Sequence, residues 1–211
     1  MKPAKLRLGT VYGGWTIAPD SLDASSVICS FGVGNDISFD LEAIERFGLT
    51  VHGFDPSPEA VQWISEQVDL PANYVFHDYG LGNEDGNVAF SAPTSGGMYS
   101  SSQSQVHAGR KKISLPVKSL ATVIHSMPNA FIHLLKLDIE GAEYDLIDDI
   151  IRHRSSIGQI LIEFHHRIGV ASLKETVKAV NRLRGAGFAL FHVSSTSSEF
   201  SFLRWTDANP G

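Results

Sequence analysis

VICSFGVGNDISFDLEAIERFGLTVHGFD, residues 27–55, contains the unit from which the fold can be predicted. An apolar run at 27–31 is followed by a glycine-containing loop, a segment with apolar residues at helical spacing, and a second apolar run at 50–54. Short, continuously apolar runs are typical of strands that are buried on both faces. Gly48 closes the middle segment, where a helix commonly ends. We therefore predict a strand, a helix and a parallel second strand.

The same alternation continues along most of the chain. Pro58 suits the first turn of a second helix, which is expected to run to about residue 68. The remaining elements follow from the same patterns: strands at 74–78, 131–138 and 157–166, helices at 143–154 and 172–187, and a hairpin of strands at 188–195 and 199–205. Ser172 and Glu175 form a capping box at the start of the last helix. The pattern predicts an α/β fold with a mostly parallel seven-stranded sheet, one antiparallel strand, and helices on both faces.

One region interrupts this alternation. Residues 91–112 are rich in Ser, Gly and Gln, which predicts a mobile loop that either acts as a lid or has no role. The segment that follows is predicted to be an edge strand, because Pro116 cannot donate a hydrogen bond to a ladder. We expect a single domain over 1–211, with 1–24 as a short N-terminal extension.

Composition excludes several classes of protein. The 211 residues include 17 Lys and Arg and 23 Asp and Glu, so the net charge of -6 argues against a binder of nucleic acids or anionic membranes. Cys29 is the single cysteine, so no disulfide can form within the chain. The first residues lack the apolar core of a signal peptide, and no run approaches the ~20 apolar residues of a membrane span. A cytoplasmic protein is expected.

The loop after the first strand is the first candidate binding element. Ser30, Gly32 and Gly34 stand where the backbone can turn tightly and approach a ligand. A dinucleotide site needs a third glycine at 37, where this chain has Ile37, so the loop is poorly suited to bind a pyrophosphate. Asp36 is expected to cap the following helix. By itself, a loop with two glycines is equally consistent with an ordinary tight turn.

Two further candidates follow the second and third strands. Asp55 lies 21 residues after Gly34, a spacing that suits hydrogen bonds to ribose hydroxyls; the alternative is a helix N-cap. Asp78 and Tyr79 could accept from the amino group of an adenine and cover its ring, whereas a simple turn is the alternative.

The stretch LLKLDIEGAEYDLI, residues 134–147, places three carboxylates directly after a buried strand. Asp138, Glu140 and Glu143 would raise one another's pKa unless a cation or a hydrogen-bond donor offsets their charges. Acidic residues are also favoured in the first turn of a helix. That alternative explains Glu143 well and Asp138 less well.

KLDIEGAE, residues 136–143, resembles the signature of FkbM-type methyltransferases that use S-adenosylmethionine (SAM). The similarity extends over roughly residues 25 to 205 and includes SFGVGNDISFD, VHGFDPSP, GLGNEDGNVAF and LIEFHH. It implies a Rossmann-like class I methyltransferase fold and O-methylation, often of sugars or natural products. It also implies that Gly32 and Gly34 form the SAM loop, that Asp55 binds the ribose, and that Asp138 is the acid after the fourth strand. The chain departs from the family in its short N-terminal region and in SLATV, where members commonly carry acidic residues.

Methyl transfer to a hydroxyl profits from a general base. In the predicted strand IEFHH, Glu163 and His165 share one face, so we expect both near Asp138, with His165 as the base. One variant adds Mg²⁺ or Mn²⁺, held by Asp138, Glu163 and His165. The sequence favours the interpretation without a metal, in which Glu163 and His165 bond each other. Trp15 either closes over the cofactor or, as the sequence favours, anchors the N-terminal segment in the core.

The leading hypothesis is therefore a SAM-dependent O-methyltransferase acting on a small molecule or a glycan, with no nucleic-acid or membrane partner. A protein that keeps this fold and binds SAM or a partner without turnover is the alternative. A nicotinamide-dependent oxidoreductase is disfavoured by Ile37 and by the acidic sheet edge. The oligomeric state does not follow from the sequence.

Overall fold

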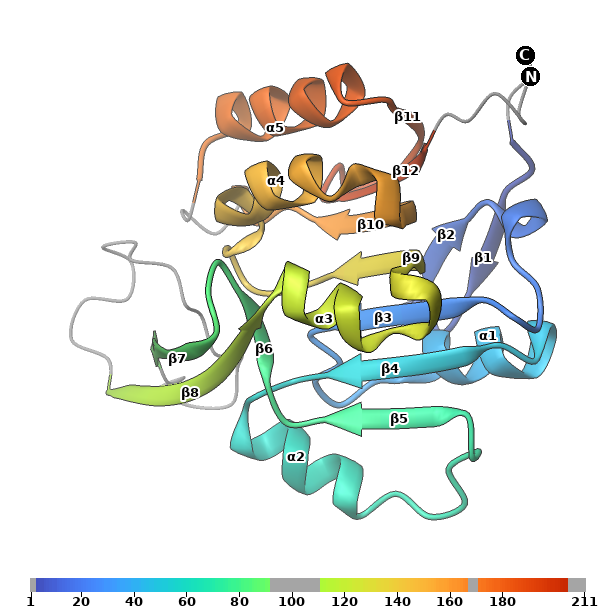
Figure 1. Ribbon diagram of the computed structural model, residues 1–211, viewed down its shortest axis with the longest axis vertical. Helices are drawn as coiled ribbons and strands as arrows, with labels where there is room; N and C mark the ends of the chain where they lie inside the picture. Colours follow the sequence, from blue (N-terminus) through green and yellow to red (C-terminus); the bar gives the residue numbers. More distant parts are fainter. Residues whose placement is uncertain (1–2, 92–110, 167–170, 205–211) are drawn as a thin grey trace.

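The computed structural model describes residues 3–91, 111–166 and 171–204. Its centre is a seven-stranded sheet in the order β11-β12-β10-β9-β3-β4-β5 (Figure 1). The strands are β3 (Val27–Phe31), β4 (Thr50–Phe54), β5 (Tyr74–His77), β9 (Ile132–Leu137), β10 (Ile157–Glu163), β11 (Phe188–Val193) and β12 (Glu199–Arg204). β12 alone runs against its neighbours, so the predicted sheet with one antiparallel strand is confirmed.

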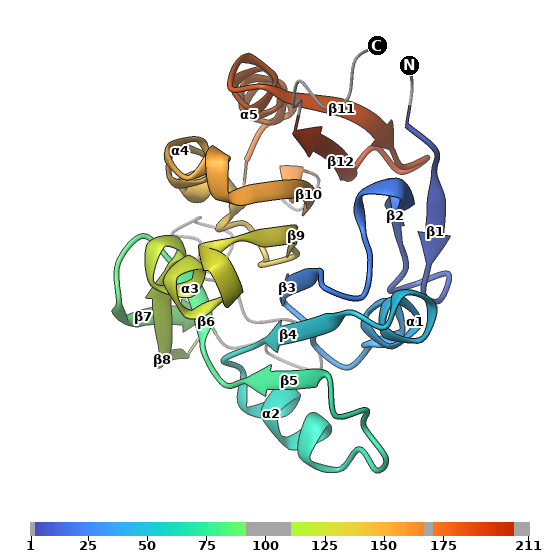
Figure 2. The same ribbon diagram turned by 45° about the vertical axis from the view of Figure 1, so that its right-hand side comes forward.

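Helices cover both faces of this sheet. They are α1 (Ser38–Phe47), α2 (Pro58–Ser65), α3 (Leu120–Ser126), α4 (Glu143–Arg152) and α5 (Leu173–Gly185), with short 3₁₀ turns at Pro19–Ser21, Pro128–Ala130 and Arg154–Ser156. Helices α3, α4 and α5 pack on one face, and α1, α2 and the N-terminal hairpin pack on the other (Figure 2). The strands serve both cores because their side chains alternate: Cys29 and Phe31 belong to the first core, and Ile28 belongs to the second.

Two smaller sheets flank the central one. β1 (Leu6–Leu8) pairs with β2 (Trp15–Ile17), and β8 (Lys112–Ser119) lies between β6 (Gly80–Gly82) and β7 (Gly86–Ser91). The predicted edge position of the strand with Pro116 is therefore wrong, since β8 is the middle strand. Pro116 is tolerated because β6 pairs only with residues 117–119, so Pro116 itself has a partner on one side only, Asn87 of β7.

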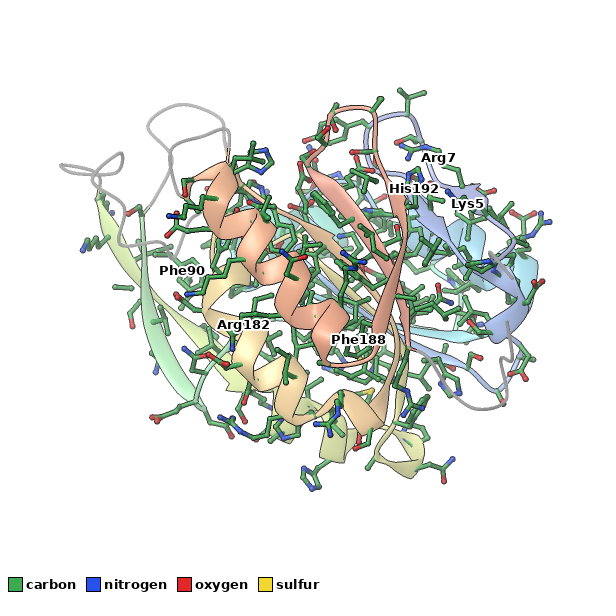
Figure 3. The ribbon with its side chains drawn as sticks, turned by 90° about the horizontal axis from the view of Figure 1, so that it is seen from above. Lys5, Arg7, Phe90, Arg182, Phe188 and His192 are labelled. Carbon is green, nitrogen blue, oxygen red and sulfur yellow. The ribbon has the colours of Figure 1, made fainter. Side chains whose placement is uncertain are left out.

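The N-terminal segment is part of the packed structure. Trp15 is 3% exposed and lies in the core beside α1, which confirms the anchoring interpretation. Gln159 of β10 holds the segment through its side-chain amide, which accepts from Ala18 N (2.9 Å) and donates to Ala18 O (2.8 Å). Lys5, Arg7 and His192 lie close together where this segment runs beside β11 (Figure 3).

Several predicted boundaries change in the structure. α2 ends at Ser65 instead of residue 68, and α3 was not predicted. The strand expected at 157–166 ends at Glu163, so His165 lies two residues beyond it. The predicted lid at 91–112 falls, apart from its ends, outside the described residues. No helix among the described residues has the length and apolar character needed to cross a membrane.

The topology brings the ends of three neighbouring strands to the same edge. The hydrogen-bond ladder extends one residue past each strand: Gly32 N donates to Phe54 O (2.9 Å), Asp55 N to His77 O (3.1 Å) and Asp138 N to Phe31 O (3.1 Å). Residues that directly follow β3, β4 and β9 are thus placed side by side, although they lie far apart in the sequence.

Candidate active site

A cavity of about 300 Å³ opens at the carboxyl ends of β3, β4 and β9. Its polar wall includes Gly32, Gly34, Asp55, Asp138 and Glu140, and its apolar wall includes Phe31, Phe54, Leu81, Phe90 and Ile139. Ligands of open α/β sheets bind in such a crevice. A mostly apolar cavity with a few convergent polar groups is typical of a small-molecule site.

Gly32 is where the backbones after β3 and β9 come closest. A Cβ atom at this position would lie 1.7 Å from the carbonyl oxygen of Asp138, and the residue has a φ of +75°. Gly34 also has a positive φ, +53°. Gly32 is therefore required by the local geometry, because another residue would collide there, and Gly34 is favoured because other residues are strained at a positive φ.

Asp55 links the glycine loop to the start of α2. One carboxylate oxygen accepts from Gly34 N (3.0 Å), and the other accepts from Ser57 N (2.9 Å) and Ser57 Oγ (2.6 Å). The alternative that Asp55 caps α2 is wrong, because Ser57 is the N-cap and accepts from Ala60 N. Asp55 faces the cavity, and its hydrogen bonds to Gly34 and Ser57 hold the glycine loop in place.

Other predicted site residues lie elsewhere. Asp78 is exposed, and neither Asp78 nor Tyr79 lines the cavity; the Tyr79 ring carries the ammonium group of Lys118 at 4.2 Å. Asp36 precedes the N-cap of α1 and binds both Ser38 N and Thr10 Oγ1 at 2.8 Å, so it ties the N-terminal segment to the helix start.

Ser30 lies beneath the glycine loop and not at the cavity. It is fully buried in a polar cluster with Asp40 and Lys136. The Lys136 ammonium donates to the carbonyl oxygens of Phe31 (3.4 Å) and Gly32 (3.1 Å). Burial raises the pKa of Asp40 to about 6, and the charge of Lys136 offsets part of that rise. The loop thus rests on buried charged groups.

Sequence reasoning missed several residues of the cavity wall. Tyr12, 74% exposed, reaches the cavity from the N-terminal segment, and Leu81 and Phe90 reach it from β6 and β7. No sequence pattern places these three near the glycine loop, because their position depends on how the small sheets pack against the large one.

The carboxylates after β9 gather around His165. Glu143, fully buried at the start of α4, accepts from Ile139 N (3.1 Å), Gly141 N (3.2 Å) and His165 Nδ1 (2.8 Å). His165 Nε2 lies 3.7 Å from Asp138 Oδ1 and 3.7 Å from Glu140 Oε2. The predicted proximity of His165 to Asp138 is therefore present, but its hydrogen bond goes to Glu143 and not to Glu163.

Charge and burial shift the pKa values in this cluster. Burial raises the pKa of Asp138, of Glu163 and of Glu140, in the last case to about 7. Burial alone lowers the pKa of His165, but the bond to Glu143 and the surrounding carboxylates outweigh it and raise that pKa to about 9. In addition, His165 does not line the cavity, whereas Asp138 and Glu140 do. The raised pKa and the position outside the cavity wall make His165 unsuited to the expected role of general base.

Comparison with known proteins agrees with this geometry. A model of the methyltransferase FkbM domain matches residues 21–190. A search of curated proteins finds no relative with significant sequence similarity.

Solved structures with a similar fold are distant in sequence. The fibrillarin pre-rRNA processing protein of Methanococcus jannaschii is 10% identical, with a TM-score of 0.52 over 86% of this chain and 67% of that one. A precorrin-6y C5,15-methyltransferase from Geobacter metallireducens is 13% identical, with a TM-score of 0.50 over 88% of this chain and 82% of that one. An rRNA methylase from Streptococcus thermophilus is 14% identical, with a TM-score of 0.50 over 89% and 91%. At these identities the likeness shows the fold alone.

Gly32→Ala is expected to lower the free energy of unfolding by about 2 kcal/mol or more, because the new Cβ meets a backbone carbonyl and the residue is held at positive φ. Urea unfolding measures the loss. Gly185→Ala, at the end of α5 with nothing within 4 Å of the added Cβ, is the control and should leave stability unchanged or slightly raised. Equal stability of the two variants would contradict the close approach at Gly32.

Stability should also depend on the buried carboxyl of Asp40. Its pKa in the folded protein, about 6, exceeds the ordinary value of 3.8, so the folded state binds the proton more tightly. This contribution to stability is complete below about pH 4 and is lost as the pH rises to about 6, up to roughly 3 kcal/mol at ~1.4 kcal/mol per pKa unit. Urea unfolding between pH 4 and 6.5 should show this slope in the wild type and a flatter one in Asp40→Asn. Parallel slopes would refute it.

Proposed function

Because the chain belongs to the FkbM methyltransferase family, whose methyl donor is SAM, we propose that it transfers the methyl group to a hydroxyl oxygen of a small molecule or a glycan. The observation that carries the proposal is the cavity, in which the loop of Gly32 and Gly34, the carboxylate of Asp55 and the acidic edge after β9 converge. The O-methyl preference rests on the family resemblance of KLDIEGAE and its neighbours.

The proposed roles of the cofactor-binding residues follow from their chemistry. The loop of Gly32 and Gly34 allows close backbone approach to the methionine part of the donor. Asp55 is the acceptor for the ribose hydroxyls, since its oxygens line the cavity and are already held in orientation by Gly34 and Ser57. Asp78 and Tyr79 directly precede the wall residue Gly80, and their contact with the adenine stays a prediction.

The acidic edge suits the chemistry of this donor. When bound, SAM supplies a methyl group on a positively charged sulfonium sulfur. Asp138 and Glu140 face the cavity and place negative charge where a cationic donor needs it. Alignment of acceptor and donor provides much of the rate increase in such a displacement.

We assign the general base to Glu140, in place of His165. Glu140 lines the cavity and has a φ of 54°, a conformation that residues other than glycine seldom adopt, in the turn between β9 and α4. Its carboxylate receives the proton of the acceptor hydroxyl as the new bond to carbon forms and the carbon–sulfur bond breaks. Asp138 is a second wall carboxylate, and Glu163 and His165 each have a polar atom within 4.8 Å of it without lining the cavity.

The net charge of the protein bears on which methyl acceptor it can bind. Two of the structural neighbours carry rRNA in their names, but their likeness to this chain is one of fold. The net charge of -6 disfavours a polyanionic acceptor, whose phosphates need a basic surface. A small hydroxylated acceptor needs no such surface.

Calorimetric titration with SAM, S-adenosylhomocysteine and NAD tests the cofactor site. We expect binding of the first two, and Asp55→Asn should weaken SAM binding about 10-fold or more, because charge-assisted hydrogen bonds to the ribose are lost. Asp20→Asn, an exposed carboxylate on the 3₁₀ turn after β2, is the matched control and should bind like the wild type. NAD binding without SAM binding would overturn the proposal in favour of an oxidoreductase.

Glu140→Gln tests the base. We expect kcat for methyl transfer to fall by about 10²–10⁴, the usual contribution of a general base, with a much smaller loss of SAM affinity from the removed charge. S-adenosylhomocysteine formation on a panel of hydroxylated acceptors measures the turnover. An unaltered kcat would remove Glu140 from the mechanism. SAM binding with no turnover on any acceptor would support the non-catalytic alternative.

A further inference from the structure

The orientation of His165 is set by a buried carboxylate. Glu143 accepts two backbone N–H groups, from Ile139 and Gly141, on the same oxygen that contacts His165 Nδ1 at 2.8 Å. An oxygen that accepts from N–H donors is a carboxylate oxygen without a proton of its own. The proton in the third bond therefore belongs to Nδ1, and Nε2 is the nitrogen on which a proton and a metal ion would compete.

Nε2 of His165 points at two carboxylates that lie at ion-pair distance but accept no hydrogen bond from it. Its side chain is 9% exposed, and the nearest carboxylate oxygens, on Asp138 and Glu140, are each 3.7 Å away, beyond hydrogen-bond length. Across the described parts of the chain, Nε2 has no hydrogen bond. One donor atom each from Asp138, Glu163 and His165 lie within 4.8 Å of one another.

This arrangement matches the requirements of a metal centre. Histidines that bind metals almost always donate the other ring N–H to a carboxylate or carbonyl, which fixes the ring, and Glu143 does this here. Four carboxylates surround a single imidazole, so negative charge is in excess even if the ring carries a proton. A buried nitrogen aimed into that excess is a separate observation from the acidic cluster itself.

We propose that Asp138, Glu163 and His165 form a binding site for a divalent cation, Mn²⁺ or Mg²⁺. Two carboxylates and one imidazole suit these hard cations, which accept oxygen ligands and keep open positions for others. Glu143 positions the imidazole and does not bind the ion. The cation replaces the proton on Nε2, since both need the same lone pair.

The place of the site indicates its use, and this part rests on the proposed function. Asp138 belongs both to the cation site and to the cavity wall, so a cation held there would lie at the edge of the cavity. A hydroxyl oxygen of the acceptor bound there would lose its proton more readily, because the cation stabilises the oxyanion. The proton passes to Glu140, next to the site. The cation would thus select acceptors with oxygen atoms able to bind a metal.

The test is Mn²⁺ binding to the whole chain, in the absence of SAM and of acceptor, followed by the electron paramagnetic resonance of the free ion. We expect one Mn²⁺ per chain. Glu163→Gln and His165→Gln should each weaken binding at least about 10-fold, and Glu143→Gln should weaken it by ~10–100-fold through loss of the orienting bond. Glu45→Gln, an exposed carboxylate on α1, is the control and should bind as the wild type does.

A spectroscopic measurement keeps the proposal testable even if a variant fails to fold. Electron spin echo modulation of the Mn²⁺-loaded wild type should show coupling to one imidazole nitrogen. Absence of stoichiometric binding, absence of the nitrogen coupling, or binding that persists in folded Glu163→Gln and His165→Gln would each overturn the site. SAM is titrated separately, so a protein that binds Mn²⁺ but not SAM fails only the proposed function, and the reverse result fails only the cation site.

Discussion

The contact between Gly32 and the carbonyl of Asp138 is the constraint on which the site depends. It exists because β3 pairs directly with β9, so that the turns after both strands occupy the same space. A residue with a Cβ would push the two turns apart, and the glycine loop would move away from the acidic edge. On its other side β3 pairs with β4, and this second pairing brings Asp55 to Gly34.

Buried charge is the second organising feature. The charged groups form two clusters, one beneath the glycine loop and one above it. Beneath the loop, Lys136 binds the loop carbonyls and stands near the buried Asp40. Above it, the carboxylates after β9 surround His165, whose hydrogen bond to Glu143 fixes the ring. Buried ionised groups are costly unless they are compensated, so neither cluster is explained by stability alone. The acids at this sheet edge are the groups that the proposed cationic donor and the proposed divalent cation would compensate.

Much of the fold follows from local patterns. Apolar runs, helical spacing, the Gly48 stop and the Ser172 capping box were sufficient for the order of strands and helices in the large sheet. The predictions that are wrong concern places where the pairing of strands decides the structure. Pro116 would indicate an edge strand only if each residue of β8 had pairing partners on both sides. β6 is too short for this, because its pairing with β8 does not reach Pro116. Glu163 and His165 do lie together near Asp138, as predicted, but strand alternation is not the reason, because β10 ends at Glu163.

The sequence by itself determined the class of fold, the glycine loop, the placement of Asp55 and Asp138 directly after their strands, and the family, because each depends on residues close together in the chain or at a typical spacing. Only the tertiary structure decided that Ser30 lies under the loop, that Tyr12 and Phe90 reach the cavity, and that His165 bonds Glu143. These relations join different segments of the chain. They depend on strand order and on the packing of turns, for which no periodicity in the sequence exists.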